Sequence, residues 1–367
     1  MALPRQAAAA ATALAAHLAT VMPLRHLRDR SLLDDMAARW CERHRVWHGP
    51  QHLLGMLEQL ATRPPGDERD VLMLAALYHD AVYDPRAANN EESSAALLFE
   101  HAADPLHKSV VRAAEIVIAS KWVQRPESAL IEQFFALDSH QLAAGCPLHV
   151  RLAYEHAIFC EYQWADWKLY RTKRREFLEG WARLFPEHRH GVEQCMELLA
   201  GLQPRVAVYP GSFDPFHLGH LSILRQAEAV FDKVIVAVGI NRQKSTAIDS
   251  AKARHLDLQS RLRFHEVASF GGLLTRFIEE LELPVTIVRG VRDGTDLEAE
   301  LRFVRFLNEL RPDTRVVWMS CEAHFQHLSS SAIRELEAIA PGSGERYVPG
   351  TATIYELAEP AGFSSAS

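Results

Sequence analysis

The hydrophobic pattern of the sequence changes once, close to Gly201, and this change divides the chain. Before it, apolar residues recur three and four positions apart, as over 71–78 and 110–118, which is the spacing of an amphipathic helix. After it, helical stretches alternate with short runs rich in β-branched residues, at 206–209, 234–238, 285–288 and 316–319. Such alternation predicts a parallel sheet with right-handed crossovers. We therefore expect a multidomain chain, with an all-α domain over 1–200 and an α/β domain over 201–367.

Length and charge limit the functional classes. The 367 residues exceed what a single hydrophobic core normally supports, which agrees with two domains. The 47 acidic and 40 basic side chains give a net charge of -7, which opposes binding to a nucleic-acid backbone. No stretch of about 18 uninterrupted apolar residues predicts a membrane span. We therefore expect neither a nucleic-acid nor a membrane partner.

The cysteines and the start of the chain bear on its location. The five cysteines are odd in number and form no C-x-x-C pair, so neither a disulfide framework nor a structural zinc site is predicted. The Ala-rich stretch 7–24 has the apolar character of a secretory signal. Because His17 interrupts it and the helical pattern continues beyond it, a packed N-terminal helix is the simpler interpretation. A cytoplasmic location is expected.

The first predicted strand of the α/β half leads directly into a candidate phosphate site. The loop after it carries Gly211, and His217 and His220 stand three residues apart where a helix begins. This is the carboxyl end of a parallel strand, where open α/β sheets bind ligands. Helix N-termini attract anions, glycine permits close backbone approach, and imidazole donors can follow charge on a phosphoryl oxygen. Two solvated histidines at a helix start, the alternative, would require no flanking glycine.

Three further elements follow later strands of the same sheet. Arg289 and Arg292 flank Gly290 after the 285–288 run, and guanidinium groups can grip phosphates in bidentate fashion. Ser329–Ser331 open another helix, and Lys244 follows the 234–238 run. Taken singly, these residues are equally typical of a surface ion-pair cluster, a serine cap and a loop lysine. Their convergence at one sheet edge favours a site for several phosphates.

Five segments in order carry a family resemblance. The region 206–349 resembles the H-x-G-H nucleotidyltransferase superfamily, and within it the phosphopantetheine adenylyltransferases, through YPGSFDPFHLGH (209–220), FDKVIVAVGINRQK (231–244), FGGLLTRF (270–277), RGVRDGTDLEAE (289–300) and SSSAIREL (329–336). The resemblance implies a Rossmann-like fold and attack of 4′-phosphopantetheine on ATP, with Mg²⁺, to give dephospho-coenzyme A and pyrophosphate. Without a covalent intermediate, catalysis would rest on positioning and charge neutralisation.

The resemblance also implies residue roles. Ser212 would hold the attacking phosphate, and His220 and Lys244 would stabilise the α-phosphate, with His217 completing the H-x-G-H motif. Arg289 would bind the pantetheine phosphate and Leu274 the pantetheine arm. The remaining substrate and nucleotide contacts would come from Gly211, Phe213, Gly290, Arg292, Glu300, Ser329, Ser330 and Ser331.

Three departures from the family pattern leave the acceptor open. His217 stands where the pantetheine enzymes usually carry Thr or Asn, the E-E-R pattern expected after Lys244 is not found, and Leu307 replaces an expected Asn. One alternative is a nucleotidyltransferase for another acceptor, which would use either CTP with a phosphorylated alcohol or ATP with nicotinamide mononucleotide. The other alternative is a nucleotide-binding sensor that regulates the helical half. The oligomeric state, a homo-oligomer included, stays open.

The helical half contains a candidate metal constellation. His52, His79, Asp80 and Asp138 form an H, HD, D series, and imidazole with carboxylate suits one or two divalent cations such as Mn, Fe, Zn or Mg. His48 lies four residues before His52, so we expect it to face the same metal from the preceding helical turn and to act as a general acid. A buried His–Asp pair is also common as an ordinary core contact.

Further residues give this half its own resemblance. The H-x-x-x-H spacing, the HDAVY segment (79–83) and the NEESS segment (90–94) resemble a bacterial branch of the HD-domain metal-dependent phosphohydrolases, from about Leu32 to Trp181. The resemblance implies metal-assisted attack of water on a phosphoester, with Glu91 as a carboxylate that either supports the metal ligands or takes part in catalysis. A fused bifunctional enzyme is the leading hypothesis, and an HD domain that serves only as structure is the alternative.

Overall fold

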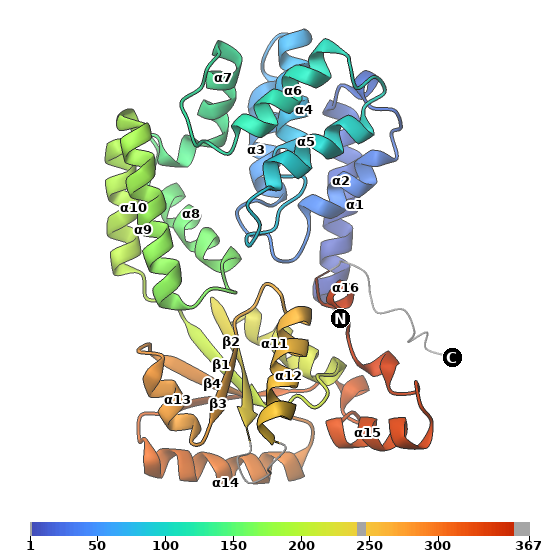
Figure 1. Cartoon of the computed structure of the whole chain (residues 1–367), viewed down its shortest axis with the longest axis vertical. Coiled ribbons are helices and arrows are strands. Elements are labelled where there is room, and N and C mark those ends of the chain that lie inside the picture. The colour runs from blue at the N-terminus through green and yellow to red at the C-terminus, as the bar shows by residue number, and fades with distance from the viewer. Residues whose placement is uncertain (1, 241–246, 356–367) are drawn as a thin grey trace. The chain divides into compact units, whose positions relative to one another are not determined.

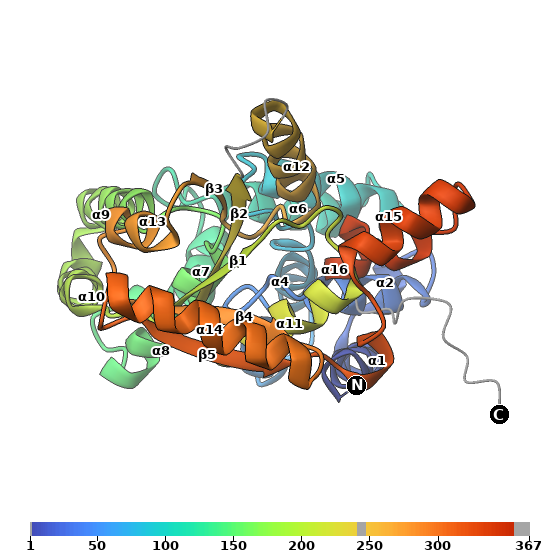
Figure 2. The ribbon, with the colours of Figure 1, turned by 90° about the horizontal axis from the view of Figure 1, so that it is seen from below.

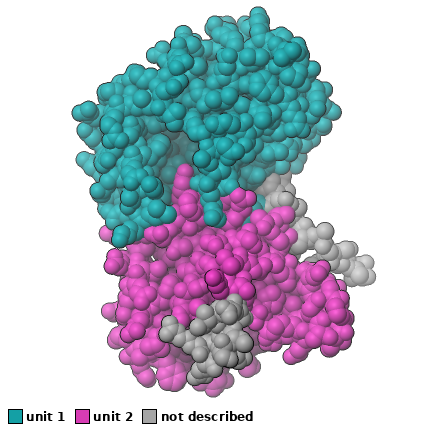
Figure 3. Space-filling view, in the orientation of Figure 1, with its two compact units in different colours: residues 1–161, 168–201, 355–367 teal, residues 162–167, 202–354 magenta. Residues whose placement is uncertain are grey.

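The computed structural model describes residues 2–240 and 247–355, and these form two compact units (Figure 3). The helical unit comprises the chain up to Glu161, then Lys168–Gly201 and Tyr355. The α/β unit comprises Tyr162–Trp167 and Leu202–Ile354. The fold class predicted from the sequence, a helical region followed by a parallel α/β domain, is confirmed.

Ten α-helices build the described part of the helical unit (Figure 1). They are α1 (Ala2–Val21), α2 (Leu32–Trp40), α3 (Pro50–Ala61), α4 (Asp67–Tyr78), α5 (Asn90–His101), α6 (Lys108–Ala119), α7 (Ala129–Asp138), α8 (Leu148–Glu161), α9 (Trp167–Leu184) and α10 (Arg189–Gly201). Helix α4 is buried on every side from Asp70 to Tyr78 and packs against α3, α5, α6 and α7. A helix that is apolar all round belongs in the interior, which explains the unbroken apolar run in its sequence.

The α/β unit is built on five parallel strands, β1 (Val206–Gly211), β2 (Lys233–Ile240), β3 (Val267–Gly271), β4 (Val285–Val291) and β5 (Arg315–Ser320). Their order is β3-β2-β1-β4-β5, and Figure 2 shows the strands in this succession. The chain passes from β1 to β2 on one side and returns with β4 on the other. Ligands of open α/β sheets bind where the strand order reverses in this way, at the carboxyl ends of the strands.

Strand β3 was not among the four strands predicted from the sequence. It lies at an edge of the sheet, and only its first residue, Val267, is buried, so it lacks the β-branched run that marks β1 and β2. The inner strands β1 and β2 are buried along most of their length, as expected for strands covered on both faces.

Four helices connect successive strands: α11 (Leu218–Glu228), α12 (Ala247–Arg261), α13 (Leu274–Glu280) and α14 (Gly294–Leu310). Two more, α15 (Ser330–Ile339) and α16 (Thr351–Tyr355), follow β5. Among the described residues, no helix combines the length and the apolar character needed to cross a membrane.

A buried lysine ties the segment 162–167 to the sheet. Lys233, the first residue of β2, is paired with Glu266 at 2.8 Å and is 1% exposed. Its Nζ also donates to the carbonyl oxygens of Gln163 at 2.5 Å and Ala165 at 2.7 Å. A buried ammonium needs such partners, which explains why this short segment packs with the α/β unit.

Candidate active sites

The loop between β1 and α11 is shaped by a close contact. The ring of Phe213, whose φ is 47°, folds over Gly211. A Cβ added at Gly211 would lie 2.7 Å from Phe213 Cζ, so any side chain at this position would force the ring to move. Ser212 is exposed between them, and Arg254 of α12 donates to its carbonyl oxygen at 2.7 Å.

His217 and His220 stand together at the start of α11. His217 is the residue before the helix, and its backbone N–H donates to His220 Nδ1 at 3.2 Å. The two rings stack with their centroids 3.7 Å apart. Because Nδ1 accepts a hydrogen bond, the proton of the neutral His220 ring resides on Nε2, which is thereby a donor.

Both histidines are held in the neutral form. Burial, helped by the Arg292 charge, lowers the pKa of His217 to about 4. Burial, together with His217 and Arg292, lowers the pKa of His220 well below its usual value. At neutral pH the site therefore offers hydrogen-bond donors without adding charge from these rings, and the positive charge of its described residues comes from arginine.

Arg289 and Arg292, at the end of β4, are each paired with a carboxylate of α14. Arg289 meets Glu300 through Nε at 2.6 Å and Nη2 at 2.5 Å, and its Nη1 donates to Pro210 O at 3.2 Å. Arg292 meets Asp296 at 2.6 and 2.9 Å. These pairs hold both guanidinium groups beside the end of the sheet.

The start of α15 is fastened to the β1–α11 loop. Ser329 caps the helix by accepting from Ala332 N at 3.1 Å, and Ser330 Oγ donates to Pro215 O at 3.0 Å. Ser331 Oγ accepts from Arg334 at 3.2 Å, and the same guanidinium reaches the carbonyl oxygen of Asp214. The helix start and its serines are thus fixed beside the histidine loop.

Not every predicted residue joins this cluster. Leu274 is 6% exposed and packs in the sheet core with Ile278 and Ile287. Gly290 faces α11, where an added Cβ would lie 2.9 Å from Ile223 Cγ1, so this glycine allows close packing of the helix on β4. Lys244 lies outside the described residues.

Arg254 was not predicted from the sequence. No E-E-R pattern follows Lys244, and a lone arginine on a helix carries no signal by itself. Its contact with Ser212 joins residues 42 positions apart, which only the folded chain reveals.

His217→Asn is expected to make the α/β unit less sensitive to acid. In an unfolded chain this histidine titrates near 6.5, whereas its folded pKa is about 4, so the unfolded state binds more protons between these values. Wild-type stability is therefore complete above about pH 6.5 and falls as the pH drops toward 4. The unfolding free energy of the variant minus that of wild type should therefore rise by up to about 3 kcal/mol when the pH is lowered from 7 to 4. Urea unfolding of both proteins at the two pH values measures this, and a constant difference contradicts it.

Four predicted ligands converge in the helical unit. His52 Nε2 lies 3.3 Å from His79 Nε2 and 3.1 Å from Asp138 Oδ1. His79 Nε2 lies 3.0 Å from Asp80 Oδ2 and 3.6 Å from Asp138 Oδ1. Within the described part of the chain, His52, His79 and Asp80 form the one group arranged to hold a metal ion, and Asp138 adjoins it. Two imidazoles and two carboxylates suit a divalent transition metal.

In this cluster, burial and the neighbouring charges shift the pKa values of the side chains in opposite directions. Burial acts to lower the pKa of His79, but Asp80 and Asp138 outweigh it and raise the value to about 9. Burial also acts against the Asp80 carboxylate, yet His79 and His48 hold its pKa well below the usual range. For His52 burial prevails over Asp138, and the pKa is lowered. The carboxylates are therefore ionised and ready to bind a cation.

His48 does not lie on a helix, contrary to the expectation from its spacing. Helix α3 begins at Pro50, after Gly49, because proline at the first helical position ends the preceding loop. His48 nevertheless faces the cluster, with its ring 6.3 Å from that of His52. Its Nδ1 meets Glu161 Oε2 at 2.7 Å.

Glu161 was not predicted from the sequence. Its side chain is fully buried, and Oε1 accepts the backbone N–H groups of Val46, Trp47 and His48 at 2.7, 2.7 and 2.8 Å. Oε2 also accepts from Tyr83 OH at 2.8 Å. Burial opposes the charge on His48, but Glu161 and Asp80 outweigh it and raise the pKa of His48. Glu161 thus holds Nδ1 of His48 and leaves Nε2 as the nitrogen that can donate a proton to a ligand.

Two more side chains border the cluster. Trp122 Nε1 donates to Asp138 Oδ2 at 2.6 Å, which leaves Oδ1 facing the histidines. Glu91, the carboxylate implied by the HD resemblance, lies 3.6 Å from Lys121 Nζ, and burial raises its pKa with Asp80 adding to the shift.

Comparison with known proteins concerns the α/β part. A family model described as cytidylyltransferase-like matches residues 208–336. The chain is 40% identical over 134 residues to the phosphopantetheine adenylyltransferase of Clostridium beijerinckii. The aligned stretch covers 36% of this chain and 84% of that relative. The enzyme of Clostridium perfringens is 37% identical over 147 residues, 40% of this chain and 88% of the relative. That of Rhodopirellula baltica is 33% identical over 153 residues, 41% of this chain and 85% of the relative.

Proposed function

Through its α/β unit the chain belongs to the cytidylyltransferase-like family, with phosphopantetheine adenylyltransferases as relatives, and we propose from this that it transfers the adenylyl group of ATP to 4′-phosphopantetheine. The products would be dephospho-coenzyme A and pyrophosphate. One observation carries the proposal: 40% identity over 84% of a phosphopantetheine adenylyltransferase. The neutral histidine pair and two arginines at the strand ends support it.

The residues would act by position and charge. His220 Nε2–H would donate to an oxygen of the α-phosphate as negative charge grows there, and the exposed Ser212 would hold the attacking phosphate. Arg292 and the start of α15 would bind the nucleotide, and Arg289, oriented by Glu300, the acceptor phosphate. Mg²⁺ would arrive on the phosphates of ATP and neutralise part of their charge.

Pyrophosphate release by the full-length protein tests this function. The protein is incubated with ATP, Mg²⁺ and 4′-phosphopantetheine, and then with nicotinamide mononucleotide or with CTP and a phosphorylated alcohol. Release with phosphopantetheine alone supports the proposal. Pyrophosphate release only with another nucleotide and acceptor would assign a different acceptor, the alternative that His217 favours. No pyrophosphate release with any combination would leave the sensor alternative.

Arg254→Gln is expected to lower kcat for this reaction about tenfold while the KM for ATP changes little. The guanidinium holds the Ser212 carbonyl at 2.7 Å, and loss of this contact lets the serine loop shift, where a misplacement of about 1 Å can cost up to about 100-fold in rate. Steady-state kinetics measure kcat and KM separately. The control is Arg263→Gln, which changes an arginine of the same unit that stacks on Phe264, and it should behave as wild type. Equal losses in both variants would contradict a role through Ser212.

For the helical unit we propose a second function, metal-dependent hydrolysis of a phosphoester. The observation that favours it is the convergence of His52, His79, Asp80 and Asp138 beside a histidine held by a buried glutamate. A divalent cation held by these residues would act as a Lewis acid toward the phosphoester. His48, with Glu161 on Nδ1, would give a proton to the leaving oxygen from Nε2.

Phosphate release with Mn²⁺, Zn²⁺, Fe²⁺ or Mg²⁺ and phenyl phosphate, followed in the full-length protein, tests the second function. Turnover that requires the metal and His48 supports it. Metal binding without turnover on any phosphoester would favour the alternative in which this domain serves as structure. Repeating the assay with ATP present detects regulation by the α/β unit.

A further inference from the structure

The turn that carries Asp80 is held mainly by side chains from outside it, beside two backbone hydrogen bonds, from Ala81 N to Tyr78 O and from Ala87 N to Asp84 O. Residues 80–84 follow α4 and precede α5, and each of their five carbonyl oxygens accepts a hydrogen bond from a side chain. The side-chain donors are Arg45, which reaches the carbonyl oxygens of Asp80 (2.5 Å) and Ala81 (3.2 Å), Ser94, which reaches that of Val82 (3.3 Å), His44, which reaches that of Tyr83 (2.9 Å), and Asn90, which reaches that of Asp84 (3.0 Å). Buried backbone carbonyls need partners, and a turn without secondary structure must find them in this way.

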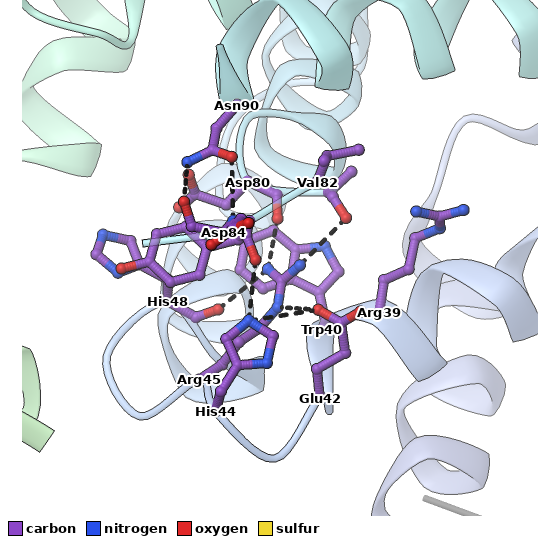
Figure 4. Close-up of polar contacts among 12 residues, drawn as sticks. Arg39, Trp40, Glu42, His44, Arg45, His48, Asp80, Val82, Asp84 and Asn90 are labelled. Atoms are coloured by element: carbon purple, nitrogen blue, oxygen red, sulfur yellow. Dashed lines mark hydrogen bonds and ion pairs between the residues drawn. The ribbon is translucent and has the colours of Figure 1, made fainter. Parts of the chain in front are cut away.

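Arg45 contributes most to this support (Figure 4). Its side chain is 0% exposed, and its Nε donates to Glu42 at 2.8 Å. The guanidinium lies 5.7 Å from the centroid of Trp40 and 5.4 Å from that of Tyr83. Its Nη1 also reaches His48 O at 3.4 Å. One planar group therefore joins the loop that carries His48 to the turn that carries Asp80.

Asn90 and Ser94 fasten the far end of the turn. Asn90 accepts from Asp84 N at 3.0 Å as well as donating to its carbonyl oxygen, and Ser94 Oγ accepts from Val82 N at 3.0 Å. These are the first and last residues of the NEESS segment. The two ends of this segment therefore support the turn.

The supported turn carries two groups of the proposed phosphohydrolase site. Its first residue, Asp80, places Oδ2 3.0 Å from His79 Nε2. Its fourth residue, Tyr83, donates to Glu161, which orients His48. A shift of the turn would move a candidate ligand and the support of the candidate proton donor together.

We propose that Arg45 is a positioning residue that sets the metal affinity of this site by fixing the backbone of Asp80. The inference rests on the metal site proposed above. Lysine cannot replace Arg45, because an ammonium group lacks the planar fork that reaches the Asp80 and Ala81 carbonyls at once. Supporting partners of metal ligands typically change metal affinity about 10- to 100-fold when they are lost.

Titration of the full-length, metal-free protein with Mn²⁺ tests the proposal without any assay of turnover. Arg45→Lys is expected to raise the Kd for Mn²⁺ about 10- to 100-fold. The matched control is Arg174→Lys, another buried arginine of the helical unit, which pairs with Glu155 at 2.7 Å away from the turn. It should lose thermal stability yet bind Mn²⁺ as wild type does.

A milder variant covers the case in which Arg45→Lys does not fold. Asn90→Ala removes both contacts with Asp84 at a half-buried position and should raise the Kd about tenfold. Wild-type Mn²⁺ affinity in folded Arg45→Lys, or in Asn90→Ala when the first variant is unfolded, would overturn the positioning role alone. If wild type and Asp80→Asn bind Mn²⁺ equally, or neither binds it, the metal site itself falls and the inference with it.

Discussion

His220→Ala is expected to lower kcat for adenylyl transfer by about 100- to 1,000-fold. A preorganised donor aimed at charge that develops in the transition state is worth about 2.7–4 kcal/mol. His220 meets the requirement, because the backbone N–H of His217 occupies Nδ1 at 3.2 Å and leaves the proton on Nε2. Burial keeps the pKa of His220 well below its usual value, so the ring stays a neutral donor at neutral pH. Pyrophosphate release at saturating ATP and acceptor measures kcat.

Two variants make this test specific. His220→Gln places an amide N–H near the position of Nε2 and should recover part of the loss. His327→Ala changes an exposed histidine whose contact is with Tyr347, and it should keep wild-type kcat. A kcat for His220→Ala within about threefold of wild type would remove this residue from the chemistry. If ATP still controlled phosphate release by the helical unit in that variant, the sensor alternative would gain support.

The fold followed from the sequence where the apolar pattern was strong. Helix α4 and strands β1 and β2 are buried on most sides, and buried elements need the continuous apolar runs that reveal them. Strand β3 was missed because its sequence contains no run of β-branched residues and its exposed Ser269 breaks the apolar pattern. Its edge position alone does not explain this, because β5 lies at the opposite edge, is mostly exposed, and was still predicted from its β-branched run at 316–319.

The candidate sites followed from the sequence only where the residues stand in motifs. His217 and His220, or His79 and Asp80, are neighbours in sequence and share a local element. Glu161 lies 113 residues from His48 and belongs to no motif, so only the packing of α8 beside the loop before α3 brings the two together. The helical turn expected at His48 was wrong, because this residue lies in a loop held by Glu161 and Arg45. Its role as a general acid stays a prediction.

Asp80→Asn is expected to weaken Mn²⁺ binding by the helical unit at least about 100-fold, more than loss of a supporting residue, for which about 10- to 100-fold is typical. The substitution keeps the shape of the side chain and removes the negative charge that lies 3.0 Å from His79 Nε2. That charge is a main reason why the pKa of His79 is raised to about 9 against the effect of burial. Mn²⁺ binding to wild type at neutral pH must therefore release a proton, and affinity should fall as the pH falls.

Thermal unfolding with and without metal gives an independent reading of the same change. A ligand at 100 times its Kd stabilises the folded state by about 2.7 kcal/mol, so wild type should show a clear Mn²⁺-dependent rise in Tm that Asp80→Asn lacks. Asp70→Asn is the control, because Asp70 is also a buried aspartate of this unit but pairs with Arg25 at 2.5 Å, away from the cluster. It should lower Tm and keep the Mn²⁺-dependent rise. An equal Mn²⁺-dependent rise in Tm in wild type and Asp80→Asn would mean that the metal binds at another site, because loss of a true ligand would weaken binding and reduce the stabilisation.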